Sequence, residues 1–350
     1  MRPLFYIHQA SCISPQASFE NIDLETLHEP VDKKMMSKEP SYEGIPPGIL
    51  RRMGKAVRIG VGAALPIIKQ HPEINGFIIG TANGGMEDCI KFLNQIIQYE
   101  EGQLTPGNFV QSTPNGIAAQ LGMISKNRQY NITHVHRGLS FENALLDAAM
   151  QLKVNAGNHY LLGAVDEISA YNYNIEYLAG WFKEEDISVT ELYNANTPGG
   201  VAGEGAAMFL VNNESDWAIA ALRGITTLHQ EDIMLVKDAL ENFIAAHLPE
   251  GETIDLFLSG ENGDNRILKY YEACESVLDP NIAIARFKHF TGEFHTATGV
   301  ALWLACTLLK EQRIPAHMIK RSLQNSSIRN ILIYNNVRGY QHSFMLLSRP

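Results

Sequence analysis

Two spacings of apolar residues alternate along the chain, one typical of buried strands and the other of helices. Short apolar runs predict strands over 3–8, 76–80, 130–135, 159–165, 206–211, 218–225, 254–258, 282–287, 331–334 and 343–347. Longer segments with apolar residues three or four apart predict helices over 45–68, 86–99, 113–124, 140–152, 231–247, 264–277 and 296–310. Strands that alternate with helices in this way predict mainly parallel sheets covered by helices.

The order of predicted strands and helices is similar in the first and second parts of the chain. This similarity indicates an internal duplication, although the two parts share no obvious sequence identity. We place the halves at residues 1–213 and 214–350, and no polar or Pro-rich linker separates them, so we expect one compact unit. Residues 172–201, which contain Trp181, are predicted to form a folded insertion.

The amino-acid composition favours some classes of protein over others. With 45% hydrophobic residues a large core is feasible, and the net charge of −10 disfavours nucleic-acid binding. The four cysteines are far apart and form no zinc or disulfide pattern, which indicates reduced thiols, with Cys306 packed inside a helix. The start of the chain does not resemble a secretory signal, and the apolar run 299–309 is too short to span a bilayer. We therefore expect a soluble, cytoplasmic protein.

Five segments carry a recognisable order of small, polar and acidic residues. They are Gly80–Gly85, Thr105–Gly122, Gly163–Glu167, Gly203–Ala207 and Lys288–Gly299. In this order and spacing they resemble the β-ketoacyl synthase family across nearly the whole chain. The resemblance implies a thiolase-like α/β fold with five α-β-α-β-α layers and two duplicated halves. The short length and the run Ser140–Leu145 are similar to a small bacterial subfamily of aryl-polyene and flexirubin-type pathways.

The chemistry of that family needs three groups, and the chain lacks all of them. A Cys thiolate takes the acyl group as a thioester, and two His donate hydrogen bonds to the enolate oxygen. Anchored on the turn glycine Gly138, the Cys position falls on Val135, and the two His positions fall on Gly260 and Glu293. We expect His295, two residues further on, to point elsewhere. The resemblance thus implies a homologue that does not condense acyl groups alone.

The resemblance also implies a role for such a chain, that of a chain-length-factor-like subunit beside an active ketosynthase. The partner would be that ketosynthase in a heterodimer, or a second copy in a homodimer, paired through Asn131, Thr133 and Val135. Acyl groups would arrive on the phosphopantetheine of an acyl carrier protein, and no other cofactor is expected. Members of the family imply an acyl tunnel near Phe109, Ile117 and Leu121, although Leu121 also suits an ordinary core position. Spacing places Arg51, Arg52 and Lys55 on one helix face, either as a carrier-docking surface or as a solvated face.

Two other interpretations stay open. His134 and His136 are two residues apart on a predicted strand, so both would face the same side. With Glu293 or Asp264 they would offer metal ligands in principle, but packing at a subunit interface explains them as well, and we expect no metal. As bases, the same histidines would define an acyltransferase or another condensing enzyme with a non-standard site. Finally, the chain could be a structural scaffold that only stabilises its ketosynthase partner.

Overall fold

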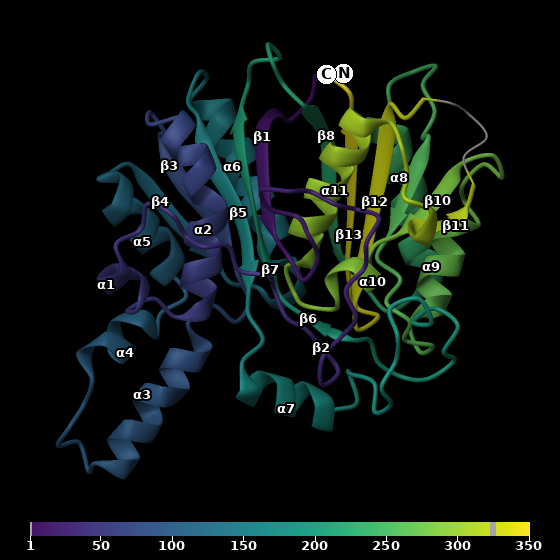
Figure 1. Cartoon of the computed structure of the whole chain (residues 1–350). Helices are drawn as coiled ribbons and strands as arrows, with labels where there is room; N and C mark the ends of the chain where they lie inside the picture. The colour runs from purple at the N-terminus through teal and green to yellow at the C-terminus, as the bar shows by residue number, and fades with distance from the viewer. Residues whose placement is uncertain (1, 323–326) are drawn as a thin grey trace.

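The computed structural model describes residues 2–322 and 327–350. Eleven strands form one continuous sheet with the strand order β11-β10-β9-β12-β13-β8-β1-β7-β5-β3-β4 (Figure 1). In the first part the strands are β1 (Phe5–Ile13), β3 (Gly76–Gly80), β4 (Tyr130–His134), β5 (Tyr160–Asp166) and β7 (Gly205–Asn212). In the second part they are β8 (Ala220–His229), β9 (Leu256–Ser259), β10 (Ala283–Arg286), β12 (Asn330–Val337) and β13 (Gln341–Ser348), with β11 (Ile319–Arg321) at the edge.

The two parts repeat one topology. Apart from β11, which pairs with the outer side of β10, the third strand of each part lies at the outside, followed by the second, fourth, fifth and first. The second, third and fourth strands are parallel, and the fifth runs antiparallel to both of its neighbours. The two first strands, β1 and β8, pair with each other and join the parts. A second, two-stranded sheet pairs β2 (Lys34–Met35) with β6 (Ala202–Gly203).

Helices cover the strands in layers. The helices are α1 (Pro47–Leu50), α2 (Lys55–Gln70), α3 (Met86–Gln98), α4 (Pro106–Gln111), α5 (Gly116–Ser125), α6 (Ser140–Val154), α7 (Ala170–Leu178), α8 (Ile233–His247), α9 (Leu268–Glu275), α10 (Lys288–Thr291) and α11 (Ala297–Glu311). The side chains of α2 and α5 pack on the outer face of the first part, and those of α8 and α9 on the outer face of the second. Helices α6 and α11 lie between the two parts. This arrangement confirms the predicted fold class.

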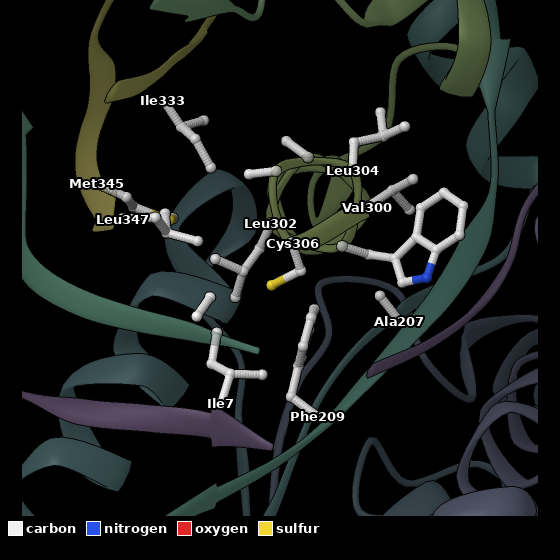
Figure 2. Close-up of a cluster of buried hydrophobic side chains, with 14 of the residues drawn as sticks. Ile7, Ala207, Phe209, Val300, Leu302, Leu304, Cys306, Ile333, Met345 and Leu347 are labelled. Carbon is white, nitrogen blue, oxygen red and sulfur yellow. The ribbon is translucent and has the colours of Figure 1, made fainter. Parts of the chain in front are cut away.

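Helix α11 shows how the central layer is filled. Its apolar side chains contact strand residues from both parts, with Ile333 and Met345 on one side and Phe209 on another (Figure 2). Its Cys306 is a buried free thiol, as the sequence predicted, and burial raises its pKa to about 12. Alternate residues of β12 and β13 face this layer, because side chains alternate along a strand. Within the described ranges, no helix is long and apolar enough to cross a membrane.

One predicted helix is broken in the structure. The range 45–68 forms α1 and α2, with residues 51–54 between them. Gly54 precedes α2, and a Cβ atom there would lie 2.2 Å from Asp88 Oδ2. The local spacing of apolar residues did not predict this break, and the contact with Asp88 makes glycine necessary at position 54.

Candidate functional site

The matched segments are joined by a buried carboxylate at the end of β5. Asp166 Oδ1 accepts hydrogen bonds from Thr81 Oγ1 at 3.0 Å and from the backbone N–H of Ala82 and Asn83 at 2.9 and 2.8 Å. Its Oδ2 accepts from Thr296 Oγ1 at 2.8 Å. Burial raises the pKa of Asp166, and these donors act against that rise. One side chain therefore holds together three of the five segments on which the resemblance rests.

The segment Gly203–Ala207 has an equivalent structural role. A Cβ atom on Gly203 would lie 2.2 Å from Thr291 O and 2.7 Å from Gly292 Cα, so two glycines allow the backbones to meet. Glu204 is buried and accepts from Ser37 N at 2.7 Å and Ile168 N at 2.9 Å. The glycines and acids of these segments thus hold loops in place. We call Asp166, Gly203, Glu204 and Gly292, with the loops that they contact, the frame.

The position of the second family histidine is part of an ion pair. Glu293 Oε1 lies 2.8 Å from Lys288 Nζ, and Glu293 Oε2 accepts a hydrogen bond from Asn262 Nδ2 at 2.8 Å. The Lys288 side chain is only 1% exposed, so Glu293 neutralises a buried cation. Both carboxylate oxygens are already engaged, which leaves Glu293 as a structural group.

The position of the first family histidine is filled by another side chain. Gly260 follows β9, and a Cβ atom there would lie 2.4 Å from Asn335 Oδ1 and 3.0 Å from Tyr334 O. Asn335 is buried at the end of β12, the strand beside β9. The Asn335 amide therefore occupies the space into which a side chain at 260 would extend.

The position of the family cysteine lies at the protein surface. Val135 follows β4 directly and is 50% exposed. The turn after it is fixed by Ser140, whose Oγ accepts from His136 N at 2.7 Å and donates to Arg137 O at 2.8 Å. Gly138 is needed here because a Cβ atom would lie 2.6 Å from Val337 Cγ2. A tight turn is present, and an inert aliphatic side chain occupies the position that the sequence predicted for the nucleophile.

A cleft of about 720 Å³, part of it open to solvent, lies beside Glu293. Asn262, Glu293 and His295 line it together, so the expectation that His295 points elsewhere is wrong. Burial, with Arg338 and Arg137 nearby, lowers the pKa of His295 to about 4. Its ring is therefore neutral at physiological pH. Local helix geometry misled the prediction, because Thr296 forms the N-terminal cap of α11 and His295 belongs to the preceding loop.

The insertion supplies the opposite wall of the cleft through aromatic side chains. Two guanidinium groups lie close to the Trp181 ring, with Arg266 at 4.5 Å and Arg338 at 4.9 Å from its centroid. Asp264 bonds Arg266 at 2.6 Å, and Glu176 bonds Arg338. These contacts fix the insertion to the loop after β9 and to the β12–β13 turn. The sequence indicated a folded insertion but gave no sign of where it docks.

His134 and His136 lie in different surroundings. Strand β4 ends at His134, so the alternation along a strand on which the common face was predicted does not extend to His136. His134 Nε2 lies 3.0 Å from Asp147 Oδ2, and Tyr130 OH also donates to this carboxyl group. His136 is exposed beyond the strand. In the described part of the chain, no group of three or more His, Cys, Asp or Glu side chains is arranged to hold a metal ion.

One of the three residues of the predicted basic face, Lys55, is held in an ion pair. Lys55 Nζ lies 2.5 Å from the buried Glu204 Oε1, so Lys55 belongs to the frame described above and is not a free docking cation. Arg51 and Arg52 are exposed between α1 and α2, where the helix is broken. The predicted single helix face is therefore replaced by two exposed arginines on a turn.

The three predicted tunnel residues do not share one cavity in this chain. Ile117 and Leu121 are buried in the core between α2 and α5, which is the alternative role considered for Leu121. Phe109 is 60% exposed and packs against Phe92, with ring centroids 5.3 Å apart. Helical spacing correctly placed Ile117 and Leu121 on one face, but that face contacts α2 and the sheet.

Strand β4 lies at the end of the sheet. It pairs with β3 on one side, and within the described residues its other edge has no strand partner. Asn131 Nδ2 donates to Ala118 O at 2.7 Å, and Thr133 Oγ1 donates to Asn115 Oδ1 at 2.9 Å, so both side chains tie β4 to α5. The backbone edge itself is left available for pairing.

The site thus belongs to an α/β protein of thiolase-like fold, and the three positions that the sequence predicted for reacting groups hold inert or paired groups. Residues 27–177 match the family described as "Beta-ketoacyl synthase, N-terminal domain". No curated protein matches the sequence. The resemblance predicted from the five segments is confirmed by this family match, which covers less than half of the chain.

Solved structures share the fold at low sequence identity. A β-ketoacyl synthase from Burkholderia phymatum STM815 is 14% identical with a TM-score of 0.76, and both chains are covered completely. The ishigamide ketosynthase/chain length factor is 13% identical with a TM-score of 0.77, again over both whole chains. A ketosynthase in complex with its chain length factor from Xenorhabdus doucetiae is 13% identical with a TM-score of 0.74, covering 99% of this chain and 98% of that one.

Proposed function

We propose that this chain is a non-catalytic, chain-length-factor-like subunit that pairs with an active ketosynthase in fatty-acid or polyketide-type biosynthesis, of the aryl-polyene or flexirubin kind. The observation that carries the proposal is the state of the three reacting positions. Val135 cannot form a thioester, Asn335 fills the place beside Gly260, and Glu293 neutralises Lys288. The partner would then supply the cysteine and both histidines.

Two of the similar solved structures support the choice of partner, since their descriptions name a ketosynthase with a chain length factor. A third similar structure is described as an acyl-carrier protein in complex with its ketosynthase. By analogy, the pair would receive acyl groups on the phosphopantetheine of a carrier protein. The exposed Arg51 and Arg52 are our candidates for contact with an acidic carrier.

The free edge of β4 is the proposed contact with the ketosynthase. Phe109, Val110, Met123 and Val135 are exposed apolar side chains in the same region of the fold. They belong to α4, α5 and the end of β4, which lie at one end of the molecule (Figure 1). An unpaired strand edge with apolar neighbours favours pairing with a second strand. The same edge pairing would place Val135 at the subunit boundary.

The proposal is tested by Val135→Asp in a binding assay with the candidate ketosynthase. Because Val135 is half exposed, the free energy of unfolding of the isolated chain should change by less than about 0.5 kcal/mol. Burying the new carboxylate at the interface should weaken the 1:1 complex at least about tenfold, measured by calorimetry or analytical ultracentrifugation. Val154→Asp is the matched control, since Val154 is 80% exposed at the far end of α6. Unchanged affinity of the Val135→Asp variant would refute the β4 interface.

A further inference from the structure

The insertion is joined to the rest of the protein at a second place, away from Trp181. Tyr193 OH lies 2.9 Å from His289 Nδ1, and it also accepts a hydrogen bond from His289 N at 3.1 Å. His289 Nε2 lies 2.7 Å from Nδ1 of His317, whose Nε2 lies 2.6 Å from Leu24 O. We call this row of three side chains and one carbonyl group the histidine link. It joins four segments, namely the insertion, α10, the short turn before β11 and the N-terminal segment.

The carbonyl group at one end fixes the direction of every hydrogen bond in the histidine link. A carbonyl oxygen only accepts, so His317 Nε2 carries a hydrogen and, in a neutral ring, His317 Nδ1 is an acceptor. His289 Nε2 must then donate to His317, which leaves His289 Nδ1 to accept from Tyr193 OH. The link is complete only while both rings are neutral, because a neutral imidazole offers one donor and one acceptor.

One added proton is incompatible with this arrangement. On His317 Nδ1 it would face the N–H group of His289, and on His289 Nδ1 it would face the hydroxyl group of Tyr193. If the hydroxyl group turned to accept that proton, its own hydrogen would lose its acceptor. Burial disfavours the charge as well, since His289 is only 1% exposed. Burial, with His317 and Arg286 nearby, lowers the pKa of His289 to about 3.

The charged groups around the histidine link are paired with one another. Arg286 lies over the Tyr193 ring, with its guanidinium carbon 3.7 Å from the ring centroid. The ion pairs on the surrounding elements join Arg286 and Lys320 to Glu261, Lys288 to Glu293, and Arg313 to Glu25. Among the described residues, the hydrogen-bond partners of the two rings are neutral groups. A proton on the link would therefore add a positive charge near Arg286 without an anionic partner.

The histidine link joins the insertion to the body of the protein where apolar contacts are few. Near Tyr193 the insertion packs on the N-terminal segment through one small apolar cluster of Met35, Val189, Leu192 and Val201. The same insertion forms one wall of the cleft through Trp181. On the other side of the link, α10 holds Glu293 in the cleft through Lys288. Opening of the link would therefore loosen one wall of the cleft and leave the sheet intact, since none of its side chains belongs to a strand.

We propose that the histidine link is a pH-sensitive contact that holds the insertion against the cleft at neutral pH and opens more often when one ring takes up a proton. His317 is only partly buried, so a proton from solvent can reach the link there. The contact is independent of the proposed subunit role, because it needs neither a partner chain nor an acyl group. The closed state is fully stable above the ordinary histidine pKa of 6.5, and its stability is lost as the pH falls below that value, because the pKa of His289 is lowered in the closed state.

The test is amide hydrogen exchange of the isolated full-length protein at about pH 7.5 and about pH 5.5, corrected for the intrinsic pH dependence of exchange. Protection over residues 187–195 should fall about tenfold or more at the lower pH, because opening takes up a proton. Protection of β5 and β7 should stay unchanged. The double variant His289→Gln, His317→Gln should lose this pH response, since each amide offers a donor and an acceptor in the same direction and does not titrate. The matched control is His71→Gln, an exposed histidine outside the link, which should keep the wild-type response.

A measurement on the unaltered protein keeps the proposal falsifiable if the double variant does not fold. Nitrogen-15 spectra of the histidine rings at about pH 7.5 should show a coupling across the N–H···N bond between His289 and His317, with both rings neutral and protonated at Nε2. A charged ring, or a hydrogen on Nδ1 of either ring, would overturn the proposal. So would protection over residues 187–195 that does not change with pH, or that falls equally in the double variant. A parallel loss of protection in β5 and β7 would also overturn it, because the acid would then unfold the whole protein.

Discussion

The frame around the cleft and the three reacting positions differ in what their side chains bond to. In the frame, Asp166 and Glu204 each accept several hydrogen bonds from loops that are distant in the chain. At the reacting positions, Val135 contacts solvent, Gly260 has no side chain, and Glu293 is held by its neighbours. Replacing a side chain of the frame would break several hydrogen bonds, whereas replacing a catalytic side chain that faces an open cleft would break few. Under the proposed function, this contrast accounts for a chain that keeps the ketosynthase fold without the groups that react.

Glu293→Ala should have the largest effect, because Glu293 has become part of the frame. Removing its carboxylate leaves the Lys288 ammonium group buried without a partner, at a cost of about 3–5 kcal/mol in the free energy of unfolding. Denaturant titration followed by circular dichroism measures this loss. Glu293→Gln should lose less, since it keeps an oxygen toward Lys288. A loss below 1 kcal/mol in Glu293→Ala would show that the pair is not structural.

Gly203→Ala tests the frame itself. The new Cβ atom would meet backbone atoms of Thr291 and Gly292, which cannot rotate away, so we expect a loss of about 2–3 kcal/mol or failure to fold. The matched control is Gly48→Ala, where no atom lies within 4 Å of the added Cβ. It should leave stability unchanged within about 0.5 kcal/mol. Equal stability of the two variants would mean that the close approach of residues 203 and 292 is not required.

Gly260→Ala tests whether Asn335 fills the place of the missing histidine. The added Cβ atom would lie 2.4 Å from Asn335 Oδ1, and we expect a loss of about 1–2 kcal/mol. Combining it with Asn335→Ala should recover about 1 kcal/mol relative to the sum of the single effects, because the obstructing amide is gone. Additive effects in this double-mutant cycle would contradict the contact.

Phe109→Ala should have the smallest effect on stability and a measurable effect on the product. Phe109 is 60% exposed, so its truncation should cost less than about 1 kcal/mol, whereas Ile117→Ala in the core should cost about 2–5 kcal/mol. If Phe109 closes the end of an acyl tunnel at the subunit boundary, the reconstituted pair should make longer products, measured by mass spectrometry. An unchanged product distribution would leave the chain as a scaffold for its partner.

The fold could be predicted because it rests on local patterns. Buried strands such as β3 and β5 are short apolar runs, and the apolar α11 has the length and spacing of a core helix. The break between α1 and α2 was not predicted from the apolar spacing, which continues across residues 51–54, although Gly54 precedes α2 in an extended conformation.

For the site, the sequence predicted which residue types occupy the three positions, but it did not predict their contacts. The sequence indicated that Val135, Gly260 and Glu293 replace reacting groups, but not that Asn262 and Lys288 hold Glu293 or that Asn335 lies against Gly260. Such contacts join distant segments and leave no local spacing signal. One usable sign was present, because two consecutive asparagines at the end of an otherwise apolar strand are unusual in a buried position.

The central claim is that the partner, and not this chain, carries the acyl group. The most direct measurement mixes equimolar chain and candidate ketosynthase with an acyl-loaded carrier protein and determines the intact mass of each subunit. We expect a 1:1 complex in which the acyl adduct is found only on the ketosynthase, and no condensation product from this chain alone. A stable acyl adduct on this chain, or condensation in the absence of the partner, would contradict the account.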